Sequence, residues 1–166
     1  MSMIGYFLLA SDDAIDRAIA DPESAHQLTD VEDSDDLVDV DKAWHCLHFL
    51  FTGTAWEGEW PLNFIVGGGT EIGEDIGYGP ARAFRSTQVT EIAGALRDLT
   101  VTALQERFDG KRMDDLQIYP SSPGAWAGLE PLAGPELDYF MGAFENVKAL
   151  VTKGAERHLG LLVWLS

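Results

Sequence analysis

The sequence predicts an α+β fold in which strands at both ends of the chain join one small sheet packed by several helices. Short apolar runs occupy residues 4–9 and 161–165, and each has the length of a buried strand. Helical patterns occupy most of the sequence between them. A chain of 166 residues with 46% hydrophobic residues can bury a sizeable core. Since no segment has the composition of an interdomain linker, we expect one compact domain over residues 1–166.

The first elements carry clear boundary signals. Ser11 precedes two acidic residues and predicts the cap of a helix that ends near residue 20. A second short helix can begin at Pro22. Residues 37–40 are either a strand or an extended lead into a central helix over 41–53.

The middle of the chain is expected to be irregular. Residues 52–79 are rich in glycine, and we expect at most a short segment at 62–66 inside a long loop. Pro80 is interpreted as the first residue of a short helix. Further helices are expected over 86–99, from a cap at Thr100 to 109, and over 135–156, with a connection rich in proline and glycine at 120–134.

The charge of the chain excludes some partners. The formal net charge is -17, and residues 1–41 hold twelve acidic residues against the single basic residue Arg17. Without a basic patch to neutralise phosphates, the sequence argues against binding to nucleic acid, and it disfavours an acidic membrane surface. The acidic run at 30–36 lacks the glycine and glutamate of a calcium loop. We interpret it as a solvated loop, or alternatively as a docking surface for a basic partner.

The expected location is the cytoplasm. No apolar run approaches the length of a membrane span, and the N-terminal residues do not have the pattern of a signal peptide. The one cysteine, Cys46, agrees with a reducing compartment.

The central helix carries the candidate catalytic residues. At 100° per residue, Asp41, Trp44, His45 and His48 share one stripe, and Ala43, Cys46, Leu47, Leu50 and Phe51 share the opposite, core-facing one. Asp41 is the expected N-cap of the helix. An imidazole can act as general acid or base, with Asp41 orienting it and Arg82 holding an anionic group. Alternatively, both histidines simply bond neighbouring loops.

Neither a metal nor a cofactor is predicted. His45 and His48 could share an ion, but zinc needs further ligands that the sequence does not place beside them. Cys46 and His48 lie about 160° apart around the helix and cannot form a nucleophilic dyad. We therefore interpret Cys46 as a core residue.

The glycine-rich segment after residue 66 matches no phosphate-binding motif, so its first glycines are interpreted as turns. Arg82, which follows it, is scarce positive charge in an acidic chain. We expect it to pair with the acidic loop or with a carboxylate of the central helix rather than with a substrate.

A second group of residues is a candidate binding surface. Trp56 and Trp60 flank two glutamates, and ring faces combined with carboxylates can hold a cation. Alternatively, such tryptophans only cover a loop. The candidate binding residues are Trp44, Trp56, Trp60, Tyr78, Glu74 and Asp75.

Several segments resemble one known family along nearly the whole chain. They are MIGYF, DVDKAWHCLHFLFTG, the glycines at 67–69, GYGPAR, ERFD, IYP and LLVWLS. The chain resembles the YfbM-like family of small bacterial proteins. The resemblance implies a compact α+β fold and a bacterial origin, and it implies no activity.

Two classes of function remain from the sequence. The first is a small acidic binding protein that engages a basic protein or peptide, as a toxin-neutralising immunity protein does. The alternative is a small enzyme that uses Asp41, His45 and His48 with Arg82, either with or without a metal. An open pocket around the histidines would favour the enzyme, and closely packed surroundings would count against it.

Overall fold

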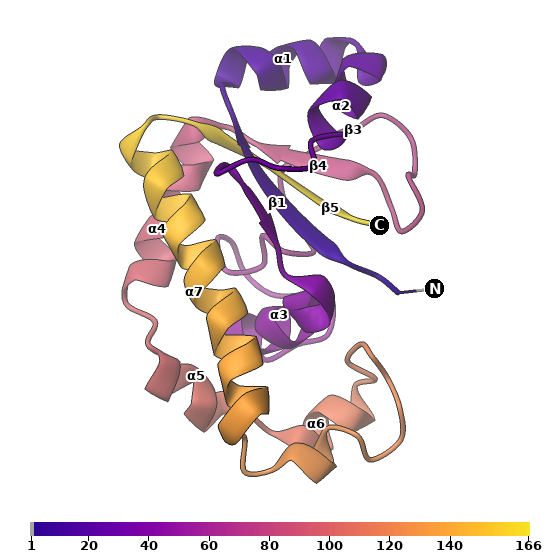
Figure 1. Cartoon of the computed structure of the whole chain (residues 1–166), viewed down its shortest axis with the longest axis vertical. Helices are drawn as coiled ribbons and strands as arrows, with labels where there is room; N and C mark the ends of the chain where they lie inside the picture. The colour runs from indigo at the N-terminus through magenta and orange to yellow at the C-terminus, as the bar shows by residue number, and fades with distance from the viewer. Residues whose placement is uncertain (1) are drawn as a thin grey trace.

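The computed structural model describes residues 2–166 and contains a five-stranded antiparallel sheet (Figure 1). The strands lie in the order β2-β1-β5-β4-β3. The two terminal strands pair along their full length, from Gly5 opposite Leu165 to Ala10 opposite Gly160. This confirms the predicted α+β fold with both terminal strands in one sheet. The strands are β1 (Gly5–Ala10), β2 (Leu37–Asp39), β3 (Thr70–Ile72), β4 (Ala81–Phe84) and β5 (Gly160–Leu165).

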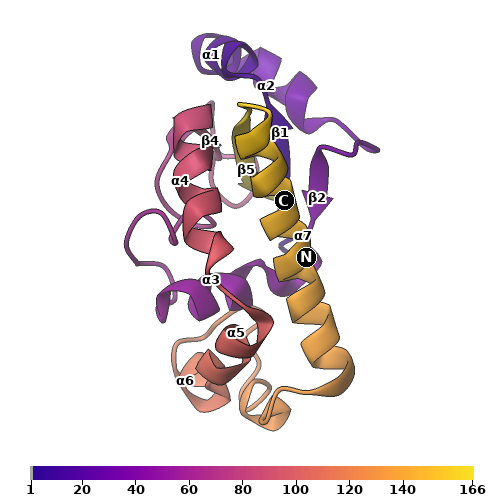
Figure 2. The same cartoon turned by 90° about the vertical axis from the view of Figure 1, so that its left-hand side faces the viewer.

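Helices cover both faces of the sheet to different extents. α4 and α7 lie side by side along one face, with α3 running across their lower half and α5 and α6 below it (Figure 2). α1 and α2 pack on the other face at one end only (Figure 1). The helices are α1 (Asp12–Ala20), α2 (Pro22–Thr29), α3 (Trp44–Thr52), α4 (Ser86–Arg97), α5 (Val101–Arg107), α6 (Gly110–Asp115) and α7 (Gly134–Glu156), with short 3-10 turns at Asp41–Ala43 and Ala127–Leu129.

The two faces of the sheet bury separate hydrophobic clusters. Alternate residues of β1 show the division, since Phe7 and Leu9 belong to the larger cluster and Leu8 and Ala10 to the smaller one. The larger cluster lies under α3, α4 and α7. The smaller lies under α1 and α2, which leaves the other end of that face less covered.

Local capping signals predicted several helices correctly. The Ser11 side chain accepts a hydrogen bond from the Ala14 backbone N–H (3.1 Å), and α1 begins there. The Thr100 side chain accepts one from the Ala103 N–H (3.1 Å) at the start of α5. Such bonds join residues three apart, so the sequence specifies them directly.

The structure differs from the predicted helix boundaries at Pro80 and Asp109. Pro80 does not start a helix, because residues 70–84 form the hairpin strands β3 and β4. The side chains of Ala81 and Ala83 are buried on one face of that hairpin, an alternation that the short glycine-flanked strands obscured. Asp109 does not end the helical region, since its side chain accepts a hydrogen bond from the Arg112 N–H (3.0 Å) and caps α6.

Among residues 2–166, no helix is both long and apolar enough to span a membrane.

Candidate functional site

The histidine-bearing helix α3 is buried on all sides. Every residue from Trp44 to Phe51 is buried, and the helix ends at Gly53, whose φ of 74° is left-handed. Gly5 of β1 allows this close packing, because a Cβ there would lie 2.8 Å from the Cβ of Trp44. The polar stripe predicted on α3 is therefore covered by other parts of the chain.

His45 is held by two backbone groups. Its Nδ1 accepts a hydrogen bond from the Tyr119 backbone N–H (2.8 Å), so the proton lies on Nε2, which donates to the Ala55 carbonyl (2.7 Å). The imidazole is wholly buried, and this burial lowers its pKa. His45 is thus a neutral group that joins two loops to α3. This is the alternative from the sequence in which the histidines bond neighbouring loops.

His48 is equally buried and less well paired. The Thr52 hydroxyl lies 3.3 Å from Nε2 and 2.8 Å from the His48 carbonyl. Among the described residues, Nδ1 has no hydrogen-bond partner. Burial, with a smaller effect from His45, lowers the pKa of His48 to about 4. The side chain is neutral at neutral pH and closed to solvent.

An aromatic stack covers His45. The Trp44 and His45 rings are nearly parallel, with centroids 4.6 Å apart, and the Trp56 ring lies 4.4 Å from His45. Tyr119 stacks on Trp44 at 5.7 Å. Of these rings, that of Trp56 is exposed, at 59% of its accessible surface. Trp44 is therefore a packing residue, and Trp56 presents one face to solvent.

Asp41 does not cap α3. It lies in the preceding 3-10 turn with a φ of 48°, and the residue at the N-cap of α3 is Ala43, which makes no side-chain cap. The Asp41 carboxylate accepts a hydrogen bond from the Tyr139 hydroxyl (2.9 Å). Burial and this bond raise the pKa of Tyr139 to about 12. Asp41 is exposed, so it does not share a pocket with the two buried histidines.

Arg82 binds backbone carbonyls, not the acidic loop or a carboxylate of α3. Its guanidinium donates to the carbonyls of Phe64 (3.1 Å), Ile65, Gly67 (2.5 Å) and Gly68 (3.2 Å). Burial lowers the pKa of Arg82 to about 10, which leaves it charged. The planar fork of donors suits a segment whose carbonyls converge. Arg82 therefore fixes the connection between α3 and β3.

The acidic loop is anchored by α7 instead. Lys153 lies 2.7 Å from the Asp36 carboxylate and donates to the Asp35 carbonyl (3.0 Å), and Arg157 lies 3.1 Å from Asp36. The hydrogen bond from Lys153 lowers the pKa of Asp36. The remaining acidic side chains at 30–35 are exposed, as expected for a solvated loop.

The other candidate residues lie at separate places. Trp60 stacks on Phe84 and donates from Nε1 to the Glu91 carboxylate (2.5 Å), away from the aromatic stack of Trp56. Cys46 is buried, and burial raises the pKa of its thiol, so it is a core residue. Within the part of the chain that the structure describes, no three His, Cys, Asp or Glu side chains converge as metal ligands would.

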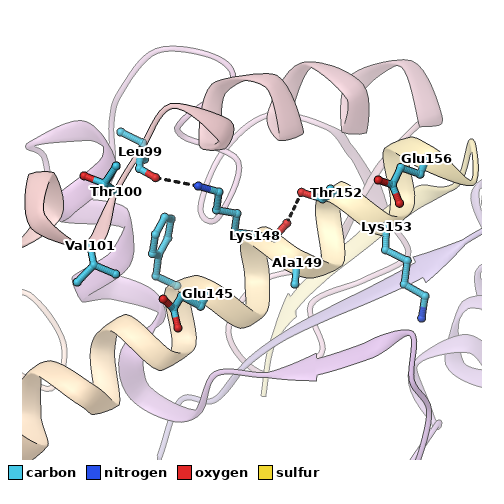
Figure 3. Close-up of a pocket in the computed structure, with 10 residues that line it drawn as sticks. Leu99, Thr100, Val101, Glu145, Lys148, Ala149, Thr152, Lys153 and Glu156 are labelled. Carbon is cyan, nitrogen blue, oxygen red and sulfur yellow. Dashed lines mark hydrogen bonds between the residues drawn. The ribbon is translucent and has the colours of Figure 1, made fainter.

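A groove of about 630 Å³ lies between the α4–α5 link and α7 (Figure 3). Lys148 points across it and donates to the carbonyls of Arg97 (3.1 Å), the last residue of α4, and Leu99 (2.9 Å) in the link. Glu145 and Glu156 lie on the same helix as Lys148 and Lys153. The two glutamates balance the two lysines, and Lys148 is already hydrogen-bonded to the chain. The lining of this groove therefore has no net charge to attract a charged ligand.

A larger cleft of about 820 Å³, which we call the α2 cleft, lies between α2, the loop after β3 and the end of β5. It contains Glu74 and Asp75 from the predicted binding residues, while Tyr78 is half-buried further along the same loop. Asp75 Oδ1 accepts from the backbone N–H groups of Gly77 (2.7 Å) and Gly79 (2.9 Å), which lowers its pKa and shapes the loop. The lining residues are Pro22, Glu23, Ala25, His26, Thr29, Ile72, Gly73, Glu74, Asp75, Ile76, Ala81, Trp164 and Ser166.

Sequence reasoning missed three members of this cleft. Glu23 and His26 come from α2 and Trp164 from β5, and the packing of α2 on this face of the sheet brings them into one cleft with Glu74. The side chains of a strand alternate between the two faces of its sheet, and this was a usable signal for Trp164, since it lies two residues from Leu162 and on the same face. No local pattern signals that α2 packs beside β3.

Comparison with known proteins agrees with the fold. A family model described as "Domain of unknown function (DUF1877)" matches residues 1–164. The crystal structure of YfbM from Escherichia coli, described as a protein of unknown function, is 23% identical, with a TM-score of 0.75 over 98% of this chain and 99% of that chain. No curated protein matches. These findings confirm the YfbM-like resemblance that the sequence segments indicated.

Proposed function

The chain belongs to the family described as "Domain of unknown function (DUF1877)", and we propose that it is a non-catalytic binding protein whose acidic surface engages a basic protein or peptide. Its charge supports this function. Of 28 acidic residues, those that form ion pairs among the described residues are Asp16 and Asp36. The uncompensated carboxylates repel one another, and a basic partner would relieve that repulsion.

The distribution of the acidic residues supports a surface rather than a reacting centre. Asp30, Glu32, Asp33 and Asp35 are exposed in the loop before β2, and Glu23 is exposed on α2. The loop directly follows α2, and Asp36 ties its end to Lys153 and Arg157 of α7, so these residues lie at the end of the molecule that carries α1 and α2 (Figure 1). A protein partner can cover such an area, whereas a small substrate cannot. Neutralising a basic toxin is one role that fits this chemistry.

The alternative function, a small enzyme using Asp41, His45, His48 and Arg82, receives less support. General acid–base catalysis needs an imidazole within reach of the substrate. Both imidazoles are wholly buried, the ring nitrogens of His45 are bonded to backbone groups, and Arg82 is bonded to carbonyls. Substrate access to them would require opening the core around α3.

The binding proposal is tested with the purified full chain as bait in a lysate of cells that naturally express it. A captured protein is then purified, and its complex is measured by light scattering and titration calorimetry at several salt concentrations. We expect a basic protein, a fixed stoichiometry and a dissociation constant that rises with salt, because exposed charge pairs are screened. Absence of any stoichiometric partner, or binding that salt does not weaken, would overturn the proposal.

A variant of the acidic loop tests whether this loop takes part in binding. Replacing Asp30, Glu32, Asp33 and Asp35 by their amides removes four charges from the acidic loop while Asp36 still anchors it. If the loop takes part, the complex weakens and its salt dependence becomes shallower. An unchanged complex would place the contact elsewhere on the acidic surface.

A further inference from the structure

The α2 cleft has a polar rim over an apolar floor. Ile72 and Trp164 on the floor are buried members of the smaller hydrophobic cluster, and Ile76 packs against it. The carboxylates of Glu23, Glu74 and Asp75 lie at its edges and are exposed. The cleft thus combines apolar and acidic lining in one concave site.

The cleft holds an excess of negative charge. Its lining includes three carboxylates, no lysine or arginine, and one imidazole, that of His26. None of the three carboxylates forms an ion pair within residues 2–166. The groove along α7 differs, because its lining contains Lys148 and Lys153. A cationic ligand is therefore favoured in the α2 cleft, whereas the α7 groove, in which Glu145 and Glu156 balance the two lysines, offers it no net attraction.

The acidic edge is held in place before any ligand arrives. Asp75 accepts two backbone hydrogen bonds through Oδ1, and the Ile76 N–H donates to the Gly79 carbonyl (3.3 Å). On the opposite edge, the Asp21 side chain accepts from the Glu23 N–H (3.2 Å) at the start of α2. A preformed site loses less conformational entropy on binding.

Lysine and arginine have the shape that this cleft requires. Their aliphatic stems pack on apolar surface, while their charged heads remain beside carboxylates and water. A volume of about 820 Å³ is large enough for more than one side chain of an extended segment. Glutamates on both edges can hold a cation that lies between them.

From this geometry we propose that the α2 cleft is the docking site for an extended segment of a partner protein that carries lysine or arginine. The aliphatic stems of these side chains pack on Ile72, Ile76 and Trp164. Their cationic groups lie between Glu23, Glu74 and Asp75. This inference rests on the proposed function and assigns it a location. The acidic loop before β2 then acts as the surrounding attractive surface.

The first test titrates a hexa-arginine peptide into the full chain and follows binding by the changes in the amide NMR shifts of the chain. We expect shifts concentrated on residues 22–29 and 72–76 and on the Trp164 indole. The triple variant Glu23→Gln, Glu74→Gln, Asp75→Asn should weaken binding about tenfold, since each exposed charge pair contributes modestly. Asn at position 75 keeps an oxygen for the two backbone bonds of the loop.

An equal change of charge elsewhere provides the control. The variant Glu106→Gln, Glu145→Gln, Glu156→Gln removes three exposed carboxylates outside the cleft and should change affinity less than twofold. The variant Ile76→Ser tests the apolar floor without altering charge and should weaken the peptide severalfold. Amide spectra confirm that each variant is folded.

Several outcomes would overturn the docking site. They are absence of peptide binding, shifts spread evenly over the acidic surface, and equal weakening by both triple variants. The natural partner separates this inference from the proposed function. A partner that binds the wild type and the cleft variant equally refutes the docking site alone, whereas failure to find any stoichiometric partner refutes the binding function.

Discussion

Acidification should destabilise the fold through His48. The side chain is wholly buried with a pKa of about 4, against an ordinary value of 6.5 in the unfolded chain. The unfolded chain therefore binds a proton at a higher pH than the folded one. The contribution is fully present above the unfolded pKa and is lost as the pH falls from 6.5 toward about 4.

The size of this loss follows from the two pKa values. Integrating proton uptake for a pKa of 6.5 unfolded and about 4 folded gives a loss of about 2 kcal/mol between about pH 7 and about pH 5. The full shift corresponds to about 3 kcal/mol. Burial also lowers the pKa of His45, which adds to the same trend.

The assay is urea unfolding of the wild type and of His48→Leu at both pH values. The titration of the 28 acidic residues is common to both chains, so the difference between their pH dependences isolates His48. We expect the variant to lose about 2 kcal/mol less than the wild type over this interval. The stability of the variant at neutral pH does not enter the comparison.

The exposed His26 provides the control. Replacement of His26 by Gln leaves both buried histidines in place, so the loss of stability that their burial causes between the two pH values should remain. Equal losses for wild type and His48→Leu would refute the reasoning, because His48 would then bind its proton equally in the folded and unfolded states.

Three further changes test the packing around the site by urea unfolding. Gly5→Ala should lower the free energy of unfolding by about 1–3 kcal/mol, because the new Cβ would overlap α3. Gly142→Ala should raise it by about 0.5–1 kcal/mol, because this helical position has open space beside it. Equal effects of the two variants would refute the close approach of Gly5 to α3. Arg82→Met should cost at least about 3 kcal/mol by leaving carbonyls unpaired and should speed proteolysis at 59–69, and a loss below about 1 kcal/mol would refute that role. Asp36→Asn should lower the free energy of unfolding by about 0.5 kcal/mol at low salt and leave it almost unchanged at high salt. A loss that does not depend on salt would refute a stabilising ion pair between Asp36 and Lys153.

The site residues show how far local patterns extend. The helical period correctly placed Cys46 in the core, but the opposite, polar stripe with His45 and His48 is buried as well. The period could not identify the covering groups, because the Tyr119 backbone that bonds His45 lies 74 residues away. For Arg82, the expected partner was a carboxylate, but convergent backbone carbonyls took that place, and their convergence depends on the path of the loop.

The sequence by itself determined the terminal strands, most helix boundaries and the excess of negative charge. These features depend on composition or on contacts within a few residues, such as the bond from Ala14 to Ser11. Tertiary structure decided which acidic side chains meet. Glu23 and Glu74 share one cleft because α2 packs on the face of the sheet that also carries Ile72 of β3, and that sheet is built by pairing between strands far apart in the sequence.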